Sequence, residues 1–480
     1  MAEEQGVIAF SQNQDGLKIA MTNPDDLKII HLIEKRSGQN LLISYITKSD
    51  LQEALLAYRP SLKSQFKKII ENFRDQSLSK EERDELTVRI VNILLEYGYQ
   101  SKASDIHIEP YTDKIIARFR IDGVLHQILE IPKELHELIL MRIKILSKMR
   151  TDEHRAAQDG KLRFEIGDEI IDVRISIVPI TEGENIVMRL LSAKSRQYAL
   201  HNLGFSEKNL EKIKKAAKDP HGMILVTGPT GCGKTTTLYG LIKILNSPKI
   251  HIATIEDPVE YDIEGISQIQ VNTKTNLSFA KGLRAIVRQD PDIIMIGEIR
   301  DKETASIAIN SALTGHLVLS TLHTNDAATT LPRLLDMEIE PFLIASTVNI
   351  VIAQRLIRKI CEKCRFSYEL SEKEIKMIEA DSELKKILKK RGSEDIKKLR
   401  LYKGAGCKVC SGTGFRGRTG IFEILSMSEK IKGLVISQAI SNKIAEIAKK
   451  EGMQTIIEHG IEKVFSGITT LEEIIRVTKT

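Results

Sequence analysis

The sequence has no tryptophan, and aromatic residues make up only 5% of its 480 positions. Proteins that thread single-stranded nucleic acid stack the bases on aromatic side chains, so this scarcity argues against such a role. The surplus of basic over acidic residues is also small, 71 against 65, which gives a formal net charge of +6. A dedicated nucleic-acid binder concentrates more basic charge than this. We therefore expect no nucleic-acid partner.

Long apolar runs are absent as well, since none approaches the roughly 18 residues that a membrane-spanning helix needs. The nearest is Phe342–Ala353, which polar residues interrupt and which we interpret as a buried core helix. The opening residues, Met1-Ala-Glu-Glu, are acidic and precede no apolar stretch, so no secretory signal is predicted. The sequence thus predicts a cytoplasmic protein that reaches the inner membrane only through partners.

Cysteine is scarce, with five residues, but four of them form two pairs with two-residue spacers. In Cys361-Glu-Lys-Cys364 and Cys407-Lys-Val-Cys410, each spacer lets both thiolates face one tetrahedral ion. Two such pairs complete a four-cysteine zinc site, which we predict to be structural because no ligand position stays open for chemistry. A redox pair or chance spacing is the alternative.

The first part of the chain divides into two modules and a linker. Residues 1–58 predict a small α/β module, with a helix start at Asn23-Pro24-Asp25-Asp26. Residues 59–83 are charge-rich and predict a partly helical linker. Residues 84–198 mix helical and alternating stretches, with a turn at Asp122-Gly123, and predict an α+β domain. Its predicted elements are helices at Leu86–Tyr97 and Glu134–Lys148 and strands at Ile115–Ile121, Lys161–Ile166 and Ile170–Ile177.

In residues 199–480, apolar strands alternate with helical stretches, which predicts a parallel sheet with helices on its faces. The predicted strands are Met223–Thr227, Ile250–Ile255, Ile293–Ile296 and Leu317–Ser320. Residues 355–418, which hold the cysteine pairs, interrupt this pattern as a zinc subdomain, and residues 428–480 predict amphipathic helices. The fold class is therefore α/β.

The first of these strands runs into Gly228-Pro-Thr-Gly-Cys-Gly-Lys234-Thr235, which fits the P-loop pattern in both sequence and context. Its glycines let backbone N–H groups surround phosphate oxygens, and the helix that follows adds a positive dipole. We predict that Lys234 reaches the β- and γ-phosphates and that the Thr235 hydroxyl ligates Mg²⁺. A chance glycine-rich turn is the alternative. The predicted nucleotide-binding residues of this loop are Gly228, Pro229, Thr230, Gly231, Cys232, Gly233, Lys234, Thr235 and Thr236.

Carboxylates follow two other strands. Parallel strands deliver their carboxyl ends to the edge where phosphates lie, so Glu298 is placed to orient or deprotonate the attacking water. Glu256, Asp257 and Glu260 end another strand and could hold Mg²⁺ through water. A salt bridge or cap for Glu298, and a capping turn before Pro258 for the other acids, are the alternatives.

Two histidines, His316 and His323, flank one further apolar strand. Because both lie at the ends of a core strand near the predicted P-loop, we predict that they sense the γ-phosphate. A purely structural role is the alternative for each.

Taken in order, these segments resemble the ATPases of type II secretion and type IV pilus assembly. The matching stretches are the P-loop, Thr254–Glu260, Leu283–Asp301 and Thr314–Asn325, together with Ala103–Pro110, Arg120–Val124 and Gln158–Gly160 in the α+β domain. The resemblance implies a RecA-like ATPase domain that follows a PAS-like domain, and a homohexamer with ATP bound between these two domains. It also supports the zinc site, which pilus-retraction ATPases generally lack.

The resemblance further maps two family arginines onto Arg174 and Arg189, where they would stabilise charge during phosphoryl transfer. Strand-edge salt bridges are the alternative. At one position the chain departs from the family pattern, because Lys161 stands where many members carry arginine. Lysine keeps the charge but loses the planar fork, so a nucleotide role is not predicted there.

We therefore predict a motor that hydrolyses ATP to drive type IV pilus extension or type II protein secretion, through an inner-membrane platform protein and further assembly proteins. A pilus-retraction motor, a DNA-uptake motor of the same superfamily and a scaffold that scarcely hydrolyses ATP are the alternatives. The cysteine pairs argue against the first, the modest charge against the second, and the presence of both Lys234 and Glu298 against the third.

Overall fold

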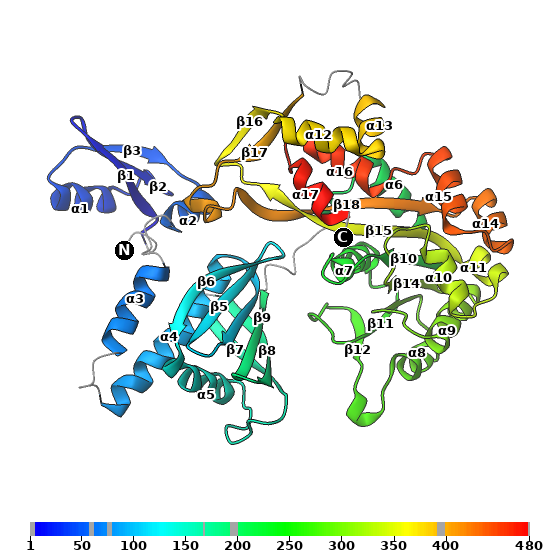
Figure 1. Cartoon of the computed structure of the whole chain (residues 1–480), viewed down its shortest axis with the longest axis horizontal. Helices are drawn as coiled ribbons and strands as arrows, with labels where there is room; N and C mark the ends of the chain where they lie inside the picture. The colour runs from blue at the N-terminus through cyan, green and yellow to red at the C-terminus, as the bar shows by residue number, and fades with distance from the viewer. Residues whose placement is uncertain are drawn as a thin grey trace. The chain divides into compact units, whose positions relative to one another are not determined.

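The computed structural model describes residues 5–56, 62–73, 79–166, 169–192, 200–390 and 399–478. Backbone contacts separate the chain into two compact units, whose elements are labelled in Figure 1. The first unit is Met1–Ser192 with Ala405–Gly414, and the second is Ala193–Gly404 with Phe415–Thr480. No helix among the described residues combines the length and apolar character needed to cross a membrane.

The first unit begins with the predicted small α/β module. Its three-stranded sheet has the order β1-β2-β3, with the first pair antiparallel and the second parallel. Its elements are β1 (Val7–Asn13), β2 (Gly16–Met21), α1 (Leu27–Ser37), β3 (Leu41–Tyr45) and α2 (Lys48–Leu56). Asp26 caps α1 by accepting a hydrogen bond from the Ile29 N–H at 3.3 Å, so the helix begins after Asp26 rather than at Asn23 as predicted.

The α+β part of the first unit contains a six-stranded antiparallel sheet in the order β6-β5-β4-β9-β8-β7. Alternate residues of its strands pack against three helices, which confirms the α+β arrangement. The strands are β4 (Ala103–Pro110), β5 (Lys114–Ile121), β6 (Val124–Pro132), β7 (Gln158–Ile166), β8 (Glu169–Ile180) and β9 (Gly183–Ser192). The helices are α3 (Leu62–Phe73), α4 (Lys80–Gln100) and α5 (His136–Leu146). The predicted linker thus holds α3 and the start of α4, and residues 167–168 lie outside the described part.

The second unit is built on a seven-stranded sheet in the order β12-β11-β13-β14-β10-β15-β18. All neighbouring pairs are parallel except the last, β15 and β18. The strands are β10 (Gly222–Thr227), β11 (Ile252–Glu256), β12 (Ile266–Gln270), β13 (Ile293–Ile296), β14 (Leu317–Leu322), β15 (Val348–Ile360) and β18 (Phe415–Ser426). The predicted parallel sheet is therefore confirmed.

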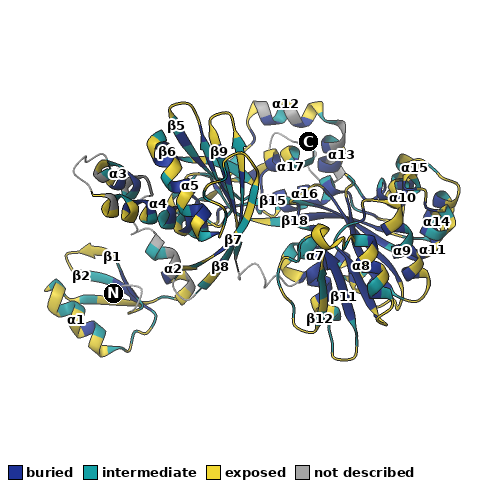
Figure 2. Cartoon of the chain, turned by 90° about the horizontal axis from the view of Figure 1, so that it is seen from below, coloured by how far each residue is buried: buried dark blue, intermediate teal, exposed yellow. Residues whose placement is uncertain are grey.

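Helices cover both faces of this sheet, and its central strands are buried along their length (Figure 2). On one face, α6 (Glu207–Ala216) and α7 (Lys234–Leu245) pack against side chains such as Ile224 and Val226. The other face contacts α8 (Phe279–Val287), α9 (Lys302–Leu313), α10 (Thr330–Asp336) and α11 (Pro341–Thr347). The predicted C-terminal helices are α14 (Glu429–Ile436), α15 (Ser441–Lys450), α16 (Ile456–Phe465) and α17 (Leu471–Thr478).

The interpretation of Phe342–Ala353 as a single core helix is wrong for its second half. Helix α11 ends at Thr347, and β15 begins at the next residue and pairs with β10, where Ile352 lies opposite Val226. The apolar residues after Thr347 are mostly β-branched, and such side chains fit a buried strand better than a helix.

A smaller subdomain is inserted between β15 and β18. It contains a two-stranded antiparallel sheet and two short helices, namely β16 (Arg365–Glu369), α12 (Glu372–Ala380), α13 (Ser382–Lys390) and β17 (Arg400–Gly404). Because β15 continues to Ile360 and β18 begins at Phe415, the insertion covers residues 361–414, which is narrower than the predicted 355–418.

Candidate nucleotide site and metal centre

The P-loop joins a fully buried strand to a helix, as its sequence predicts. Strand β10 ends at Thr227, and Gly228, Gly231 and Gly233 take φ angles of +145°, +77° and +90°. These angles lie in the left-handed region that favours glycine. Gly233 is the N-cap residue of α7, so the loop delivers the N-terminus of that helix to the carboxyl edge of the sheet. Such a terminus, with its free N–H groups and positive dipole, binds anions.

Lys234 is the first residue of α7, and its side chain folds back over the loop. Its Nζ donates to the Gly228 carbonyl at 2.9 Å and to the Pro229 carbonyl at 3.2 Å. Burial lowers the pKa of this ammonium, an effect that the nearby charge of Glu298 opposes and that of Arg355 reinforces. The lysine is therefore a partly desolvated cation, which a phosphate would stabilise.

The other loop residues fall into two groups. Pro229, Thr230 and Gly231 are exposed, and Thr235 and Thr236 are partly exposed in the first turn of α7. Cys232 instead is buried behind the loop, where burial raises the pKa of its thiol. Its neutral thiol is therefore a packing group, although the contact of this loop position with a nucleotide stays a prediction.

Glu298 lies just beyond the end of β13, and two side chains hold its carboxylate. Arg300 Nη2 donates to one oxygen at 2.6 Å, and His323 Nε2 lies 3.2 Å from the other. Strand β14 separates β13 from β10, and the register aligns the three strand ends, with Leu322 opposite Thr227. Glu298, His323 and the P-loop therefore meet at one edge of the sheet, as predicted.

His316 lies at the other end of β14. Seven steps along this strand lead from His316 to His323, so about 23 Å separate the two residues at roughly 3.3 Å per residue. The His316 Nδ1 is 2.9 Å from the Ser311 carbonyl oxygen, which gives the ring a local partner. Within this chain the structure thus brings only His323 to the P-loop edge, and a nucleotide contact by His316 stays a prediction.

The acidic residues at the end of β11 and just beyond it differ in burial. The Glu256 carboxylate is buried and accepts hydrogen bonds from Thr254 Oγ1 at 2.7 Å, from Gln268 Nε2 at 3.2 Å and from the Tyr239 hydroxyl. Burial raises the pKa of Glu256. These bonds tie α7 to β11 and β12, which indicates a structural role for Glu256.

Two further acids of this segment, Asp257 and Glu260, are exposed beyond the end of the strand. The charge of Asp257 contributes to the raised pKa of Arg300, after the larger effect of Glu298. Asp257 therefore lies within electrostatic reach of Arg300, which pairs with Glu298. A magnesium contact through these acids stays a prediction, as it does for Glu256.

Gln354 on β15 braces the P-loop, and the sequence pattern did not reveal it. Its side chain is buried, donates to the Cys232 carbonyl at 2.7 Å and accepts a hydrogen bond from Thr237 Oγ1 at 2.7 Å. One amide thus bonds both the loop and the first turns of α7. No motif marks this glutamine, and its position became visible only once β15 was known to flank β10.

Thr227, the last residue of β10, links the P-loop to the segment that carries His323. Its hydroxyl accepts a hydrogen bond from the Thr324 N–H at 2.9 Å and lies 2.6 Å from the Thr324 hydroxyl. The base of the P-loop and the segment that follows β14 are therefore joined by side-chain hydrogen bonds.

The two predicted finger arginines lie in the first unit, directly opposite each other on neighbouring strands. Registers across four strand pairs extend this pair into a row on one face of the sheet. The row runs from β5 to β7 through Arg120, Asp105, Arg189, Arg174 and Lys161. It contains four cations and a single acid.

Asp105 is the buried anion of this row. It accepts a hydrogen bond from Arg189 Nε at 2.9 Å and lies 3.4 Å from Arg120 Nε. Like charges placed opposite each other on a sheet are unfavourable, so the row has the electrostatic character of an anion-binding surface. This charge supports a phosphate role for Arg174 and Arg189, but the salt bridge of Arg189 is also the alternative that the sequence left open.

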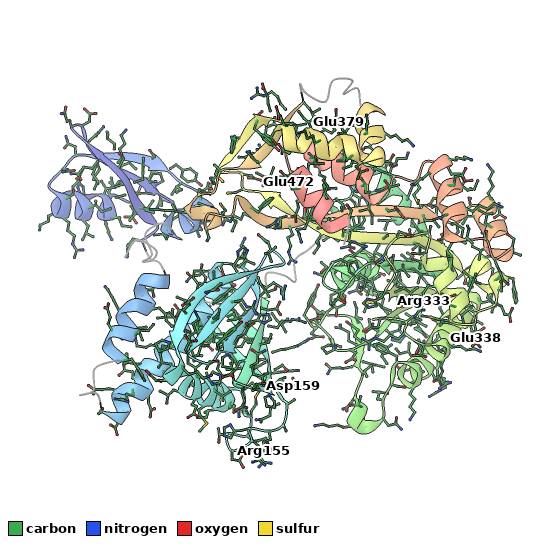
Figure 3. All side chains as sticks on the ribbon, in the orientation of Figure 1. Arg155, Asp159, Arg333, Glu338, Glu379 and Glu472 are labelled. Atoms are coloured by element: carbon green, nitrogen blue, oxygen red, sulfur yellow. The ribbon has the colours of Figure 1, made fainter. Side chains whose placement is uncertain are left out.

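The loop that leads into β7 comes just before Lys161, the position at which the chain departs from the family pattern. Arg155 is exposed in this loop, and Asp159 follows at the start of β7 (Figure 3). Gln158 holds the loop, because its side-chain amide donates to the Arg150 and Glu153 carbonyls, both at 3.1 Å. The loop therefore closes on itself and leads into the strand that carries Lys161.

The four paired cysteines come together as the sequence predicts. The sulfur atoms of Cys361, Cys364, Cys407 and Cys410 all lie within 4.8 Å of one another, and the last two are 3.8 Å apart. Four thiolates at about 2.3 Å from one tetrahedral zinc ion would be roughly 3.8 Å from each other. Backbone N–H groups of Cys407 and Gly414 lie 3.1 and 3.3 Å from the Cys410 sulfur, as expected for a stabilised thiolate. The donor set fits zinc.

Two parts of the chain match known protein families. Residues 80–476 match the family described as type II/IV secretion system protein, and residues 1–65 match the MshEN domain. The second match identifies the N-terminal module, which sequence patterns had described only as a small α/β module.

Individual proteins that resemble this chain have names that are consistent with these family matches. The type II secretion system ATPase E of Vibrio cholerae is 44% identical over 406 residues, which cover 85% of this chain and 78% of that protein. The type IV pilus assembly ATPase PilB of Myxococcus xanthus is 38% identical over 488 residues, which cover 99% and 84%. The crystal structure of the pilus retraction motor PilT with bound ADP superposes with a TM-score of 0.53 at 26% identity, covering 81% of this chain and 96% of that one.

Proposed function

The chain belongs to the family of type II/IV secretion system proteins, and we propose that it is the ATPase that drives type II protein secretion or type IV pilus assembly. The observation that carries this proposal is the meeting of three groups at one sheet edge. These are the P-loop with Lys234, the carboxylate of Glu298 and the imidazole of His323. Together they provide a phosphate-binding loop and a carboxylate for water activation, which ATP hydrolysis requires.

The phosphates of ATP would bind at the N-terminus of α7. Lys234 would exchange the carbonyls of Gly228 and Pro229 for phosphate oxygens, which restores the solvation that burial removes from its ammonium. Bound Mg²⁺ would neutralise phosphate charge. The chain would hold it through the Thr235 hydroxyl, with Asp257 and Glu260 as the exposed acids of the site.

Glu298 would orient and deprotonate the attacking water. Arg300 and His323 hold its two oxygen atoms, so the carboxylate is fixed before the substrate arrives. The His323 imidazole would contact the γ-phosphate or the water beside it. Arg174 and Arg189 would add the positive charge that phosphoryl transfer needs, which the cationic row of their sheet supports.

We propose a homohexamer that works through an inner-membrane platform protein and other assembly proteins, at the cytoplasmic face of the membrane. The names of the relatives support a place in such machines, because they are the ATPases of a secretion system and of a pilus assembly system. The four clustered cysteines would hold a structural zinc ion in the inserted subdomain.

Pilus retraction is the second candidate, and the likeness to PilT supports it. Two observations favour secretion or pilus extension instead. The relatives with the higher identity are a secretion ATPase and a pilus assembly ATPase, and the cysteine cluster is present. Deletion of the gene should abolish secretion or the formation of surface pili. Cells that keep their pili but no longer retract them would favour the second candidate.

The ATPase activity itself is tested with the purified chain. Lys234→Ala should abolish turnover, measured as phosphate release, because it removes the cation at the phosphates. Lys243→Ala, a substitution of a lysine at the other end of α7, is the control and should keep turnover. Wild-type protein without ATP hydrolysis, or a Lys234 variant with normal turnover, would contradict the proposal.

A further inference from the structure

Arg355 lies against the P-loop, yet no motif drew attention to it. It follows Gln354 on β15, the strand that flanks β10 on the side away from β14. A Cβ atom placed on Gly228 would lie only 3.3 Å from Arg355 Nη1. The guanidinium therefore lies beside the first glycine of the loop.

The hydrogen bonds of this guanidinium among the described residues all go to backbone carbonyls. Nη1 donates to the Gln354 carbonyl at 3.2 Å, and Nη2 donates to the Asn325 carbonyl at 2.9 Å. Both acceptors are neutral, while the carboxylates of Asp326 and Glu423 act on Arg355 through their charge and form no ion pair with it among the described residues. A half-buried arginine normally forms a direct ion pair, so hydrogen bonds to neutral carbonyls alone are unusual.

The charges of Arg355 and Lys234 also favour an anion at this loop. Burial lowers the pKa of Arg355, although the charges of Cys232, Asp326 and Glu423 oppose this effect. The Arg355 charge in turn contributes to the lowered pKa of Lys234. Two partly desolvated cations thus lie beside the first glycine of the same loop and repel each other. An anion bound at the loop would relieve both the desolvation and the repulsion.

From this geometry, and on the basis of the proposed ATPase function, we propose that Arg355 is a second phosphate-binding cation of the nucleotide site. It contacts the phosphate chain of ATP or ADP together with Lys234. The planar guanidinium offers several N–H donors, of which the Gln354 and Asn325 carbonyls use two, so donors remain for phosphate oxygens.

The same guanidinium also connects the phosphates to the segment that carries His323. Its acceptor Asn325 lies two residues beyond this histidine, and the intervening Thr324 is bonded to Thr227 at the base of the loop. Phosphate binding at Arg355 therefore acts on both sides of the P-loop.

The test measures binding of fluorescent ADP and ATP to the purified full-length chain. Arg355→Ala should weaken binding of both about ten- to a hundredfold, the loss expected for charge-assisted hydrogen bonds. Arg355→Lys, which keeps the charge, should fall between the two proteins. Arg400→Ala removes an exposed arginine of the same unit, paired with Glu369 at 3.0 Å, and should leave the affinity unchanged.

Competition separates a phosphate contact from a base contact. Inorganic triphosphate should displace fluorescent ADP from the wild-type protein but, in Arg355→Ala, only at about tenfold or higher concentration. Adenosine should displace it equally well from both proteins. An equal loss for adenosine would place Arg355 at the base and overturn the proposal.

Stability separates ligand binding from a structural role. Because Arg355 forms no direct ion pair with a described residue and its burial is unfavourable, Arg355→Ala without nucleotide should unfold at the wild-type temperature or above it. A variant that unfolds several degrees lower, or one that binds nucleotide with wild-type affinity, would overturn the proposal while the ATPase function stands. A wild-type chain that binds no ATP would overturn both.

Discussion

At the scale of single residues, Glu298 combines exposure to the site with firm positioning. Its side chain is 14% exposed, enough to meet a water molecule, while Arg300 and His323 engage both oxygens. A carboxylate held this way needs little reorganisation before reaction. These ion pairs also fit the salt-bridge role that sequence patterns left open, so the catalytic role of Glu298 stays a prediction.

Glu298→Gln should abolish turnover but keep nucleotide binding. The amide cannot accept a proton from water, so phosphate release should fall by a factor of about 10² to 10⁴, while the affinity for fluorescent ATP should change little. Glu303→Gln, which removes an exposed acid paired with Arg284 at 2.6 Å, is the matched control. Normal phosphate release by the Glu298 variant would remove this residue from the mechanism.

His459 on α16 is a buried histidine with a structural role in the second unit. Its Nδ1 lies 3.0 Å from the Phe422 backbone nitrogen and 3.2 Å from the Phe422 carbonyl oxygen, so it can accept from the N–H only as a neutral ring. Burial, together with the charge of Lys463, lowers the pKa of His459 from 6.5 to about 4. Below pH 6.5 the unfolded chain binds a proton that the folded chain refuses, so folding stability is present at neutral pH and is lost as the pH falls toward 4.

The free energy of unfolding should therefore fall by about 2 kcal/mol between pH 7 and pH 5 because of this group. Urea unfolding at the two pH values measures it. His459→Asn keeps a hydrogen-bond acceptor near the Phe422 N–H without titrating, so this part of the pH dependence should disappear. An unchanged pH dependence in the variant would show that other groups cause it.

Residues within recognisable motifs could be predicted from the sequence, because each motif carries its chemistry in its spacing. Lys234, Glu298 and His323 are of this kind. Gln354 and Arg355 are not, since their role depends on the register between β15 and β10. That register pairs residues more than a hundred positions apart, and no local pattern reports it.

At the scale of elements, helix α16 shows how local signals define a boundary. Thr455 and Glu458 form a complete capping box, in which the Thr455 hydroxyl accepts from the Glu458 N–H at 3.1 Å and the Glu458 carboxylate accepts from the Thr455 N–H at 2.9 Å. The box satisfies two backbone N–H groups at the start of the helix that packs on β18.

Thr455→Ala should destabilise the second unit by about 1 kcal/mol, because the cap is lost. Its melting temperature should fall by roughly 2 to 4 °C, as measured by calorimetry. Thr455→Ser retains the hydroxyl and should melt close to the wild-type temperature. Equal melting temperatures for the alanine and serine variants would show that the cap contributes nothing measurable.

Most elements of the second unit could be predicted from apolar runs, because its parallel strands are buried on both faces. The prediction of one helix over Phe342–Ala353 is wrong in the part where tertiary contacts decide between helix and strand. The run is apolar throughout, so periodicity alone could not separate α11 from the start of β15. The β-branched side chains after Thr347 were the available signal.

At the scale of the whole molecule, the cysteine cluster joins two segments that lie 42 residues apart in the chain. The clustering of the pairs was predictable because metal ligands have strict spacing, and zinc binding by them stays a prediction. The identity of the N-terminal module was not, since its residues carry no motif for chemistry and only the match of residues 1–65 to the MshEN domain reveals it.

Purified protein should contain about one zinc ion per chain, as measured by elemental analysis. Cys361→Ser should lose the ion and destabilise the inserted subdomain, because a structural site contributes its binding energy to folding. Cys232→Ser removes the remaining cysteine, which lies outside the cluster, and should keep the metal content. Protein without metal would rule out the zinc site.

Strand β15 has a mechanical consequence for the motor. It has 13 residues, bonds the P-loop through Gln354 near its middle and ends at Ile360, immediately before Cys361. About 20 Å separate Gln354 from Ile360, at roughly 3.3 Å per residue. An extended strand that is hydrogen-bonded to β18 over this distance scarcely changes its length, so β15 behaves as a rigid element. A displacement that begins at the phosphates would thus arrive at the first cysteine pair nearly undiminished.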